Sequence, residues 1–303
     1  MTPQLSVVVV AFGMARELPR TLRTLTPTHQ RGIEADDYEV LVVDNGSSPA
    51  VSDEVLEGFG GHIRLLRLDP APPSPARAAN VGIAAAAGEL IGLIVDGARM
   101  ASPGLLDAAR RAARLADRPV VASLGWHLGP VRHMQAAEAG YDQAVEDALL
   151  ADLAWEDDGY RLFDASTLGG SSAWGWFSPL AESSALFLPT ALWRELGGLD
   201  EAFARPGGGL VNHDLYRRAC ELDGIELVTL LGEGTFHQFH GGAATSGGDD
   251  FEQLQAEYVG LRGRRYEAPT NPSWFVGPVP VAAQPELARS VTLAEQYRRR
   301  HPG

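Results

Sequence analysis

The sequence predicts an α/β protein built on a mostly parallel sheet, and three observations lead to this prediction. Apolar, β-branched runs such as residues 5–11 alternate with segments that have the 3.6-residue period of helices. Residues 90–95 form a continuous apolar run between two helical patterns, which is typical of a buried parallel strand. That run ends abruptly in Asp96 and Gly97. In such sheets ligands bind at the carboxyl ends of the strands, so we expect a site there.

The first third of the chain repeats a strand–helix pattern. Gly13 ends the first strand, the Asp-Asn-Gly-Ser-Ser sequence at 44–48 is a turn, and Gly88 ends a helix. Right-handed crossovers between parallel strands follow from this alternation. We expect strands at 5–11, 39–43, 63–68 and 90–95, and helices at 16–25, 76–87 and 103–116.

The remainder of the chain is less regular, with a segment rich in aromatic residues at 155–176 that we expect to be loop. A glycine-rich stretch at 237–248 is expected to form a mobile loop. Further strands are expected at 120–126, 183–188 and 225–231, and helices at 135–153, 189–196 and 212–222. No repeat or linker divides the chain, so we expect one domain at 1–265, with halves at 1–117 and 118–265, and a C-terminal extension at 266–303.

Composition excludes several classes of function. The 303 residues carry a net charge of -14, which disfavours nucleic acid and anionic membranes as partners. No apolar run reaches the ~18 residues of a membrane helix, and we find no signal peptide. The single cysteine, Cys220, permits no disulfide within the chain. We therefore expect a cytoplasmic protein without an integral membrane segment.

Several motifs resemble those of the family 2 glycosyltransferases. They are SVVVVAFGMARELPRTLRTL, EVLVVDNGSS, ARAANVGIAAAAGELIGLIVDGARM and, later, SSALFLPTALWRELGGLDEAF. Each motif alone is weak, but their order and spacing agree with the family over most of 5–240. The resemblance implies the GT-A fold, a Rossmann-like sheet flanked by helices, with an acceptor-side subdomain. The implied halves are a nucleotide-binding half at 1–117 and an acceptor-side half at 118–265.

The resemblance also implies which residues bind the nucleotide of the donor. The end of the first strand and the acid after the second strand hold the base and ribose in the family. A carboxylate at the end of a parallel strand can itself accept hydrogen bonds from a base or a ribose hydroxyl. A turn aspartate that only stabilises its own loop is the alternative for that acid. The implied residues are Ala11, Phe12, Glu17 and Asp44.

Arg77 and Asn80 match the R-x-x-N pattern at the start of the third helix of the family. By this resemblance Arg77 binds the donor diphosphate and Asn80 binds the nucleotide or sugar. An arginine is well suited to phosphate oxygens. The alternative is a surface arginine and a helix-start asparagine without a ligand.

Asp96 matches the first acid of the metal-binding D-x-D motif of the family, whereas the third position is Ala98. The resemblance therefore implies Mn²⁺ or Mg²⁺ at the diphosphate with one acidic ligand missing. Histidine is an acceptable Mn²⁺ ligand, and the family often has a late histidine, so His237 and His240 are candidates. In a metal-free alternative, Arg99 supplies part of the positive charge.

At the position of the catalytic aspartate that is usual in the family, this chain has Asn212. An asparagine cannot take up a proton at neutral pH. Asp214 and Glu182 are the candidate catalytic carboxylates, and His213 is a further option. Asp214 could instead only stabilise the helix dipole. Without a base, a retaining mechanism becomes admissible.

Trp174 and Trp176 lie in a segment of small residues and are candidate acceptor-binding residues. Aromatic rings provide platforms for sugar rings, although loop tryptophans also cover cores.

These observations together predict a glycosyltransferase, of the hexosyltransferase class, that transfers a sugar from a nucleotide diphospho-sugar, in particular a UDP-sugar, to an unidentified acceptor hydroxyl. A homo-oligomer is compatible with this prediction. A non-catalytic nucleotide-sugar-binding protein is the main alternative, because of Ala98 and Asn212. A nucleotidyltransferase and a dinucleotide-dependent dehydrogenase are disfavoured, since the first loop has a single glycine and no G-x-G-x-x-G.

Overall fold

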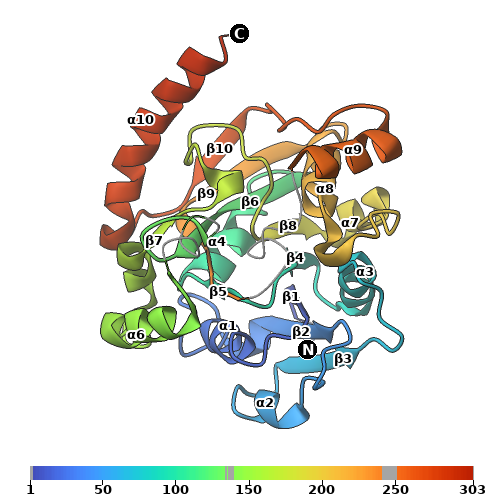
Figure 1. Cartoon of the computed structure of the whole chain (residues 1–303), viewed down its shortest axis with the longest axis vertical. Helices are drawn as coiled ribbons and strands as arrows, with labels where there is room; N and C mark the ends of the chain where they lie inside the picture. Colours follow the sequence, from blue (N-terminus) through green and yellow to red (C-terminus); the bar gives the residue numbers. More distant parts are fainter. Residues whose placement is uncertain (1–2, 134, 136–139, 241–250, 303) are drawn as a thin grey trace.

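One large sheet forms the centre of the molecule (Figure 1). The computed structural model describes residues 3–133, 135, 140–240 and 251–302. Its strands are β1 (Leu5–Ala11), β2 (Tyr38–Asp44), β3 (Ile63–Arg67), β4 (Leu90–Ile94), β5 (Arg99–Ala101), β6 (Pro119–Leu128), β7 (Ser166–Leu168), β8 (Leu186–Pro189), β9 (Glu226–His237) and β10 (Ser273–Val276). The main path of the sheet has the order β10-β9-β6-β8-β4-β1-β2-β3, with β5 paired to β9 and β7 paired to β6.

Along this path the pairs are parallel except where β8 runs antiparallel to both β4 and β6. The α-helices are α1 (Leu18–Thr24), α2 (Asp53–Glu57), α3 (Ala76–Ala85), α4 (Leu105–Ala112), α6 (Gln143–Leu153), α7 (Thr190–Leu196), α8 (Val211–Cys220), α9 (Phe251–Arg262) and α10 (Gln284–Arg300). The 3-10 helices are η1 (Ala35–Asp37), η2 (Gly159–Ala165), η3 (Gly170–Ser172), η4 (Pro206–Gly208) and η5 (Val281–Ala283).

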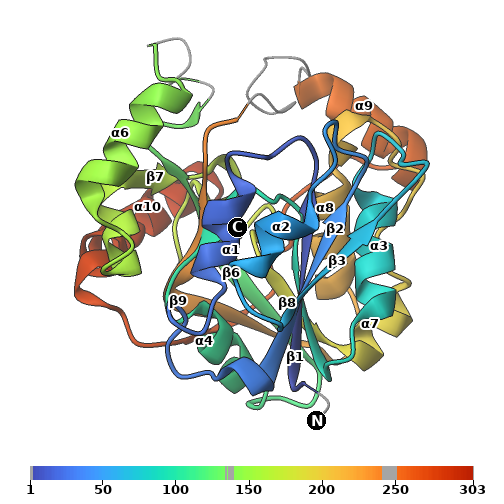
Figure 2. The same ribbon diagram turned by 90° about the horizontal axis from the view of Figure 1, so that it is seen from below.

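Two hydrophobic cores lie on the two faces of the sheet. Helices α3, α7 and α8 cover one face, and α1 and α4 cover the other (Figure 2). The strands in the middle of the sheet are therefore buried on both sides, which explains their continuous apolar sequence.

The junction between β4 and the antiparallel strand β8 depends on a glycine. Gly92 of β4 lies opposite Phe187 of β8, and a Cβ atom at position 92 would lie 2.4 Å from the Phe187 ring. The missing side chain lets the ring lie against the backbone of the strand that leads to Asp96.

The strand and helix predictions for the first third of the chain are confirmed, with ends that differ by a few residues. The prediction of loop for 155–176 is wrong, because η2, β7 and η3 lie there, and β7 pairs with β6. Of the helix predicted at 135–153, α6 covers Gln143–Leu153, Gln135 is also helical, and residues 136–139 lie outside the described residues. β9 is longer than predicted. Of the loop predicted at 237–248, His237 ends β9 and residues 241–250 lie outside the described residues.

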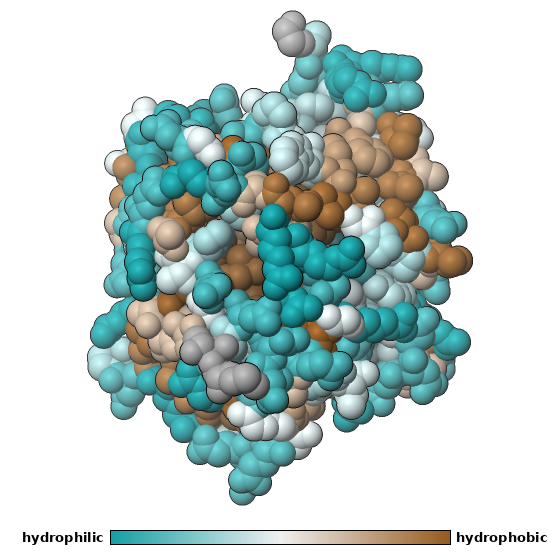
Figure 3. Space-filling model, turned by 180° about the vertical axis from the view of Figure 1, so that it is seen from behind, coloured by the Kyte–Doolittle hydropathy of each residue, from teal (hydrophilic) through white to brown (hydrophobic). Residues whose placement is uncertain are grey.

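The C-terminal segment contributes to the sheet. β10 adds a parallel edge strand to β9. On the face that Figure 3 shows, hydrophobic surface gathers at the upper right. Trp274 and Val281 are 50% and 80% exposed. In the described part of the chain, no helix combines the length and the apolar character that crossing a membrane requires.

A buried carboxyl group fastens the start of α4 to β9. Glu233 accepts hydrogen bonds from Ser102 Oγ at 2.5 Å, from Tyr160 Oη at 2.6 Å and from the Gly104 N–H at 3.0 Å. Burial raises the pKa of Glu233 to about 7 even though these donors oppose the shift. The folded chain therefore binds a proton in a pH range where the unfolded chain has lost it.

The stability of the protein should consequently fall as the pH rises from about 4.5 to about 7, the interval between the ordinary and the raised pKa of Glu233. The contribution of this one group is roughly 3 kcal/mol. The variant Glu233→Gln lacks the titrating proton. Its free energy of unfolding, measured with denaturant, should therefore rise by about that amount relative to wild type between pH 5 and pH 8. Glu54→Gln, at an exposed position of α2, is the control. An unchanged difference between Glu233→Gln and wild type at the two pH values would contradict the assignment.

Candidate active site

The site is built where the carboxyl ends of β4 and β9 meet. Asp96 follows β4 by two residues, and His237 is the last residue of β9. β5 pairs with β9 so that Arg99 lies opposite His237, and β6 pairs with β9 so that His127 lies beside His237. Directly paired residues point to the same face of a sheet. The strand register therefore places the side chains of Arg99, His237 and His127 in one row.

Asp96, His237 and His240 converge with the spacing of metal ligands. Nε2 of His237 lies 2.6 Å from Oδ2 of Asp96 and 3.1 Å from Nε2 of His240. Nε2 of His240 lies 3.6 Å from the same carboxylate oxygen. Neighbouring ligand atoms of an octahedral ion lie about 3 Å apart, so one carboxylate and two imidazoles fit a divalent cation here. The metal-ligand residues predicted from the sequence are thus brought together.

The charges of this group are strongly coupled. Burial would raise the pKa of Asp96, but the adjacent charges and hydrogen bonds of His237 and His240 hold that pKa well below its ordinary value. Burial lowers the pKa of His237, and the neighbouring Asp96 carboxylate only partly opposes this effect. For His240 burial also acts to lower the pKa, yet the contact with Asp96 outweighs it and the pKa is raised. An ionised carboxylate and a neutral His237 are the forms in which these groups bind a metal.

Hydrogen bonds to residues at α1 and in α6 hold the segment that carries the two histidines. Gln238 is fully buried, and its Nε2 donates to the carbonyl of Glu17 at 3.0 Å and to the Thr21 hydroxyl at 3.2 Å. The backbone N–H of Phe239 donates to Glu146 of α6 at 2.7 Å. The chain between His237 and His240 is therefore fixed by α1 and α6 and does not behave as a free loop at these residues.

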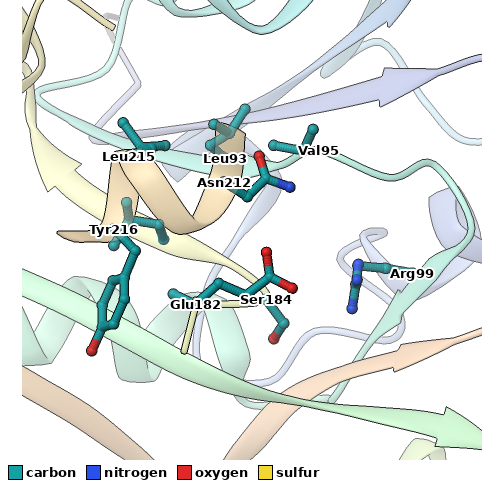
Figure 4. Close-up of a pocket in the computed structure, with 10 residues that line it drawn as sticks. Leu93, Val95, Arg99, Glu182, Ser184, Asn212, Leu215 and Tyr216 are labelled. Atoms are coloured by element: carbon teal, nitrogen blue, oxygen red, sulfur yellow. The ribbon is translucent and has the colours of Figure 1, made fainter. Parts of the chain in front are cut away.

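A pocket lies beside this group, toward β8 and α8. Glu182 and Asn212 point toward the same space, and Arg99 bounds it on one side (Figure 4). Arg99 is the residue that pairs with His237 in the sheet. The pocket lining consists of Leu93, Val95, Arg99, Glu182, Ser183, Ser184, Leu186, Asn212, Leu215 and Tyr216. A second hollow continues from it past His127 and Ser171, and shares Arg99, Glu182 and Ser184.

Glu182 and Arg99 have opposite charges and line the same pocket without forming an ion pair. Oε1 of Glu182 accepts the Ser171 hydroxyl at 2.7 Å, and Oε2 lies 3.4 Å from Nδ1 of His213. The carboxylate is thus oriented and keeps further acceptor capacity. Oδ1 of Asn212 is buried and has no hydrogen-bond partner within the described residues. A ligand with hydroxyl groups would satisfy this atom.

Asp214, the other candidate base, lies elsewhere. It is fully buried, and it accepts from Nε of Arg218 at 2.8 Å and from Nε of Arg262 at 2.6 Å. These contacts join α8 to α9 and leave Asp214 outside the pocket lining. The geometry favours a structural role for this carboxylate.

The residues predicted to bind the nucleotide are only partly accessible. Ala11 is fully buried, while Phe12 beside it is 62% exposed. Both oxygens of Asp44 accept backbone N–H groups at 2.9 Å, from Ser47 and Val51, so this carboxylate orders its own turn. Glu17 is 2% exposed and accepts hydrogen bonds from neighbouring side chains. For these positions the role in nucleotide binding stays a prediction.

Arg77 and Asn80, both in α3, have different surroundings. Arg77 is exposed at the start of the helix. Asn80 donates to the carbonyl of Leu199 at 2.9 Å and accepts the Leu199 N–H at 2.8 Å. The side chain therefore holds the Gly-Gly-Leu-Asp-Glu turn against α3, which the sequence motif alone did not indicate.

The two candidate acceptor residues do not line the pocket. Trp176 is 1% exposed, and its indole N–H donates to the carbonyl of Leu230 at 2.9 Å in the core. Trp174 packs against α10, with its ring centroid 5.6 Å from that of Tyr297. The ring of Trp174 thus packs against the C-terminal helix, and the ring of Trp176 belongs to the core. The sequence prediction of an acceptor platform at these two residues therefore lacks structural support.

The sequence argument did not identify His127 and His133. Both lie behind His237, and the ring centroid of His133 is 5.2 Å from that of His237. Their positions in the sequence could have pointed to them. His127 lies at the end of β6 and His133 lies shortly after it, in a chain with only 8 histidines.

Residues 6–97 match the family described as glycosyl transferase family 2, a stretch that runs from β1 to the Asp-Gly pair after β4. The family resemblance is confirmed over this stretch. No curated protein matches the sequence. The family 2 stretch contains Asp44, Arg77 and Asp96, whereas the histidines and the pocket residues of β8 and α8 lie beyond it.

Solved structures show that the fold extends over the whole chain. The crystal structure of S. aureus TarS matches with a TM-score of 0.52 and 13% identity, over 97% of this chain and 49% of that one. TarS 1-349 in complex with UDP-GlcNAc matches with a TM-score of 0.51 and 13% identity, over 98% and 72% of the two chains. Its complex with UDP gives 0.51 and 14%, over 98% and 71%. The chain thus spans about half the length of the full TarS structure, and the predicted GT-A fold is confirmed.

Proposed function

We propose that this protein is a nucleotide-sugar glycosyltransferase that uses a UDP-sugar and a divalent cation and transfers the sugar to an acceptor hydroxyl. The observation that carries the proposal is the convergence of Asp96, His237 and His240 beside a pocket that contains an oriented carboxylate. The family match and the UDP and UDP-GlcNAc complexes of the similar fold support the donor class.

The donor diphosphate would lie against Asp96, His237 and His240, where a bound divalent cation supplies positive charge to the leaving group. Arg99 adds a second positive charge on the pocket side of the same row of side chains. A guanidinium without an ion-pair partner in the described structure can bind the negative charge that develops on the departing phosphate.

The transferred sugar and the acceptor would occupy the pocket. Glu182 is the proposed general base, because it lines the pocket, is oriented by Ser171 and has no arginine partner. It would take the proton of the acceptor hydroxyl as that oxygen attacks the anomeric carbon and the diphosphate leaves. The free Oδ1 of Asn212 would accept a hydrogen bond from a sugar hydroxyl.

A second candidate is a binding protein without catalysis. Asn212 supports it, because a residue that cannot take up a proton lies in the pocket where the family resemblance implies an acid. Glu182 then serves only to bind a hydroxyl group. Turnover of any donor sugar separates the two candidates.

Calorimetric titration of the purified chain with UDP and GDP, each with and without Mn²⁺, tests the donor class. We expect UDP binding that requires Mn²⁺. Hydrolysis of UDP-sugars by the same protein, with water as the acceptor, tests for catalysis without knowledge of the natural acceptor. The absence of nucleotide binding under every condition would rule out the proposal, and binding without hydrolysis would favour the non-catalytic candidate.

A further inference from the structure

The imidazole ring of His133 is buried against His237, on the side of that ring opposite Asp96. His133, in the segment after β6, is 1% exposed, and its Nδ1 lies 3.3 Å from Nδ1 of His237. Its Nε2 lies 3.1 Å from the carbonyl oxygen of Leu128. The opposite nitrogen of His237, Nε2, faces Asp96 at 2.6 Å. One chain of contacts therefore runs from the Leu128 carbonyl through two rings to the Asp96 carboxylate.

The hydrogen-bond directions in this chain of contacts follow from what each atom can do. A neutral imidazole carries a single N–H, so a neutral His133 can donate at only one of its two ring nitrogens. A carbonyl oxygen only accepts, so Nε2 of His133 donates to Leu128 and its Nδ1 becomes an acceptor. Nδ1 of His237 then donates to that nitrogen. A donating Nδ1 leaves Nε2 of a neutral His237 with its lone pair, on the side where Asp96 lies at 2.6 Å and Nε2 of His240 at 3.1 Å.

We propose that His133 is a positioning residue that keeps His237 in the tautomer with Nδ1 protonated, so that Nε2 is presented to a divalent cation together with Asp96 and His240. The inference rests on the metal-dependent donor binding proposed above, and it identifies the ligand atom and what fixes it. Two of the three protein ligands are then imidazole nitrogens, so the group favours Mn²⁺, Co²⁺ or Zn²⁺ over Mg²⁺.

His127, His133 and His237 also lie close enough together to hold an ion by themselves. The hydrogen bonds argue for a supporting role instead. Nδ1 of His127 accepts the backbone N–H of His133 at 3.0 Å, and Nε2 of His133 is engaged by Leu128. His127 thus fixes the backbone of His133, and His133 fixes the ring of His237, which is the arrangement by which outer residues orient metal ligands.

The test is the affinity of the full chain for Mn²⁺ alone, measured from the electron paramagnetic resonance signal of the free ion. His133→Phe keeps the ring size and removes both nitrogens, and we expect Mn²⁺ to bind it roughly 10- to 100-fold more weakly. His133→Asn should restore most of the affinity, because its Oδ1 can accept the proton of His237. His29→Phe is the matched control, since the His29 ring contacts a backbone carbonyl, that of Ala101 at 3.2 Å, outside the site.

Nitrogen-15 NMR of the wild type with bound Zn²⁺, a diamagnetic ion, tests the tautomer without any variant. We expect His237 to carry its proton at Nδ1, and Mn²⁺ to bind with one ion per chain. A proton found at Nε2 alone, a second bound ion, or equal Mn²⁺ affinity of wild type and His133→Phe would overturn the inference. If wild type and variant both bind UDP with the same Mn²⁺ dependence, only this inference fails. If wild type binds neither UDP nor Mn²⁺, the proposed function fails as well.

Discussion

Replacing Asp96 with asparagine is expected to abolish the Mn²⁺ dependence of UDP binding and to weaken binding in the presence of Mn²⁺ by at least about 100-fold. Loss of an outer partner of a metal ligand already weakens metal binding by roughly 10- to 100-fold, and Asp96 is the one carboxylate of the group. The asparagine keeps the size of the side chain and removes its charge. Isothermal titration of wild type and variant with UDP, with Mn²⁺ or with a chelator, measures the effect.

Asp36→Asn is the matched control for this experiment, because Asp36 is exposed in η1, just before the amino end of β2 and so away from the carboxyl ends of the strands. The control should bind as wild type does. Wild type stripped of metal should resemble the Asp96 variant. Tight UDP binding that is indifferent to Mn²⁺ would instead assign the charge of the site to Arg77 and Arg99, which is the metal-free alternative.

Replacing Glu182 with glutamine is expected to lower kcat by roughly 100- to 10,000-fold, the usual contribution of a general base, with little change in the KM for the donor. The glutamine can still accept the Ser171 hydroxyl, which lies 2.7 Å from the carboxylate, so the pocket should keep its shape. Initial rates of UDP-sugar turnover, measured beside the exposed control Glu295→Gln, provide the test.

Asp214→Asn separates the two carboxylates that the sequence offered as bases. This variant leaves two arginines without their buried partner, and we expect it to lower the free energy of unfolding by about 3–5 kcal/mol. Its kcat per folded molecule should stay near that of wild type. The opposite pattern, in which Asp214→Asn loses turnover and Glu182→Gln keeps it, would contradict the assignment of Glu182.

The sequence alone determined the strands that create the site. The run that ends in Asp96 and the one that ends in Asp44 are continuous and apolar, because both faces of these strands are buried. Since parallel strands end at the same edge of the sheet, the prediction of a ligand site beside Asp96 followed from the pattern without coordinates. The late histidines also followed from the sequence, but only through the family resemblance, because nothing local relates His237 to a residue 141 positions earlier.

Only the tertiary structure decided which polar side chains are free to act. Asp214 and Glu182 are both acids near α8 and β8, yet two arginines neutralise the first and a serine orients the second. Trp176 belongs to the core because its indole N–H reaches a carbonyl of β9.

The alignment of His127, His237 and Arg99 depends in the same way on strand register. β9 pairs with β6 on one side and β5 on the other, so residues from three distant segments become neighbours. Local sequence sets the period of a strand and the face of each side chain, whereas the partner of each side chain is set by long-range packing. For that reason the sequence could predict where a site would lie, whereas only the structure decided which side chains are neighbours there.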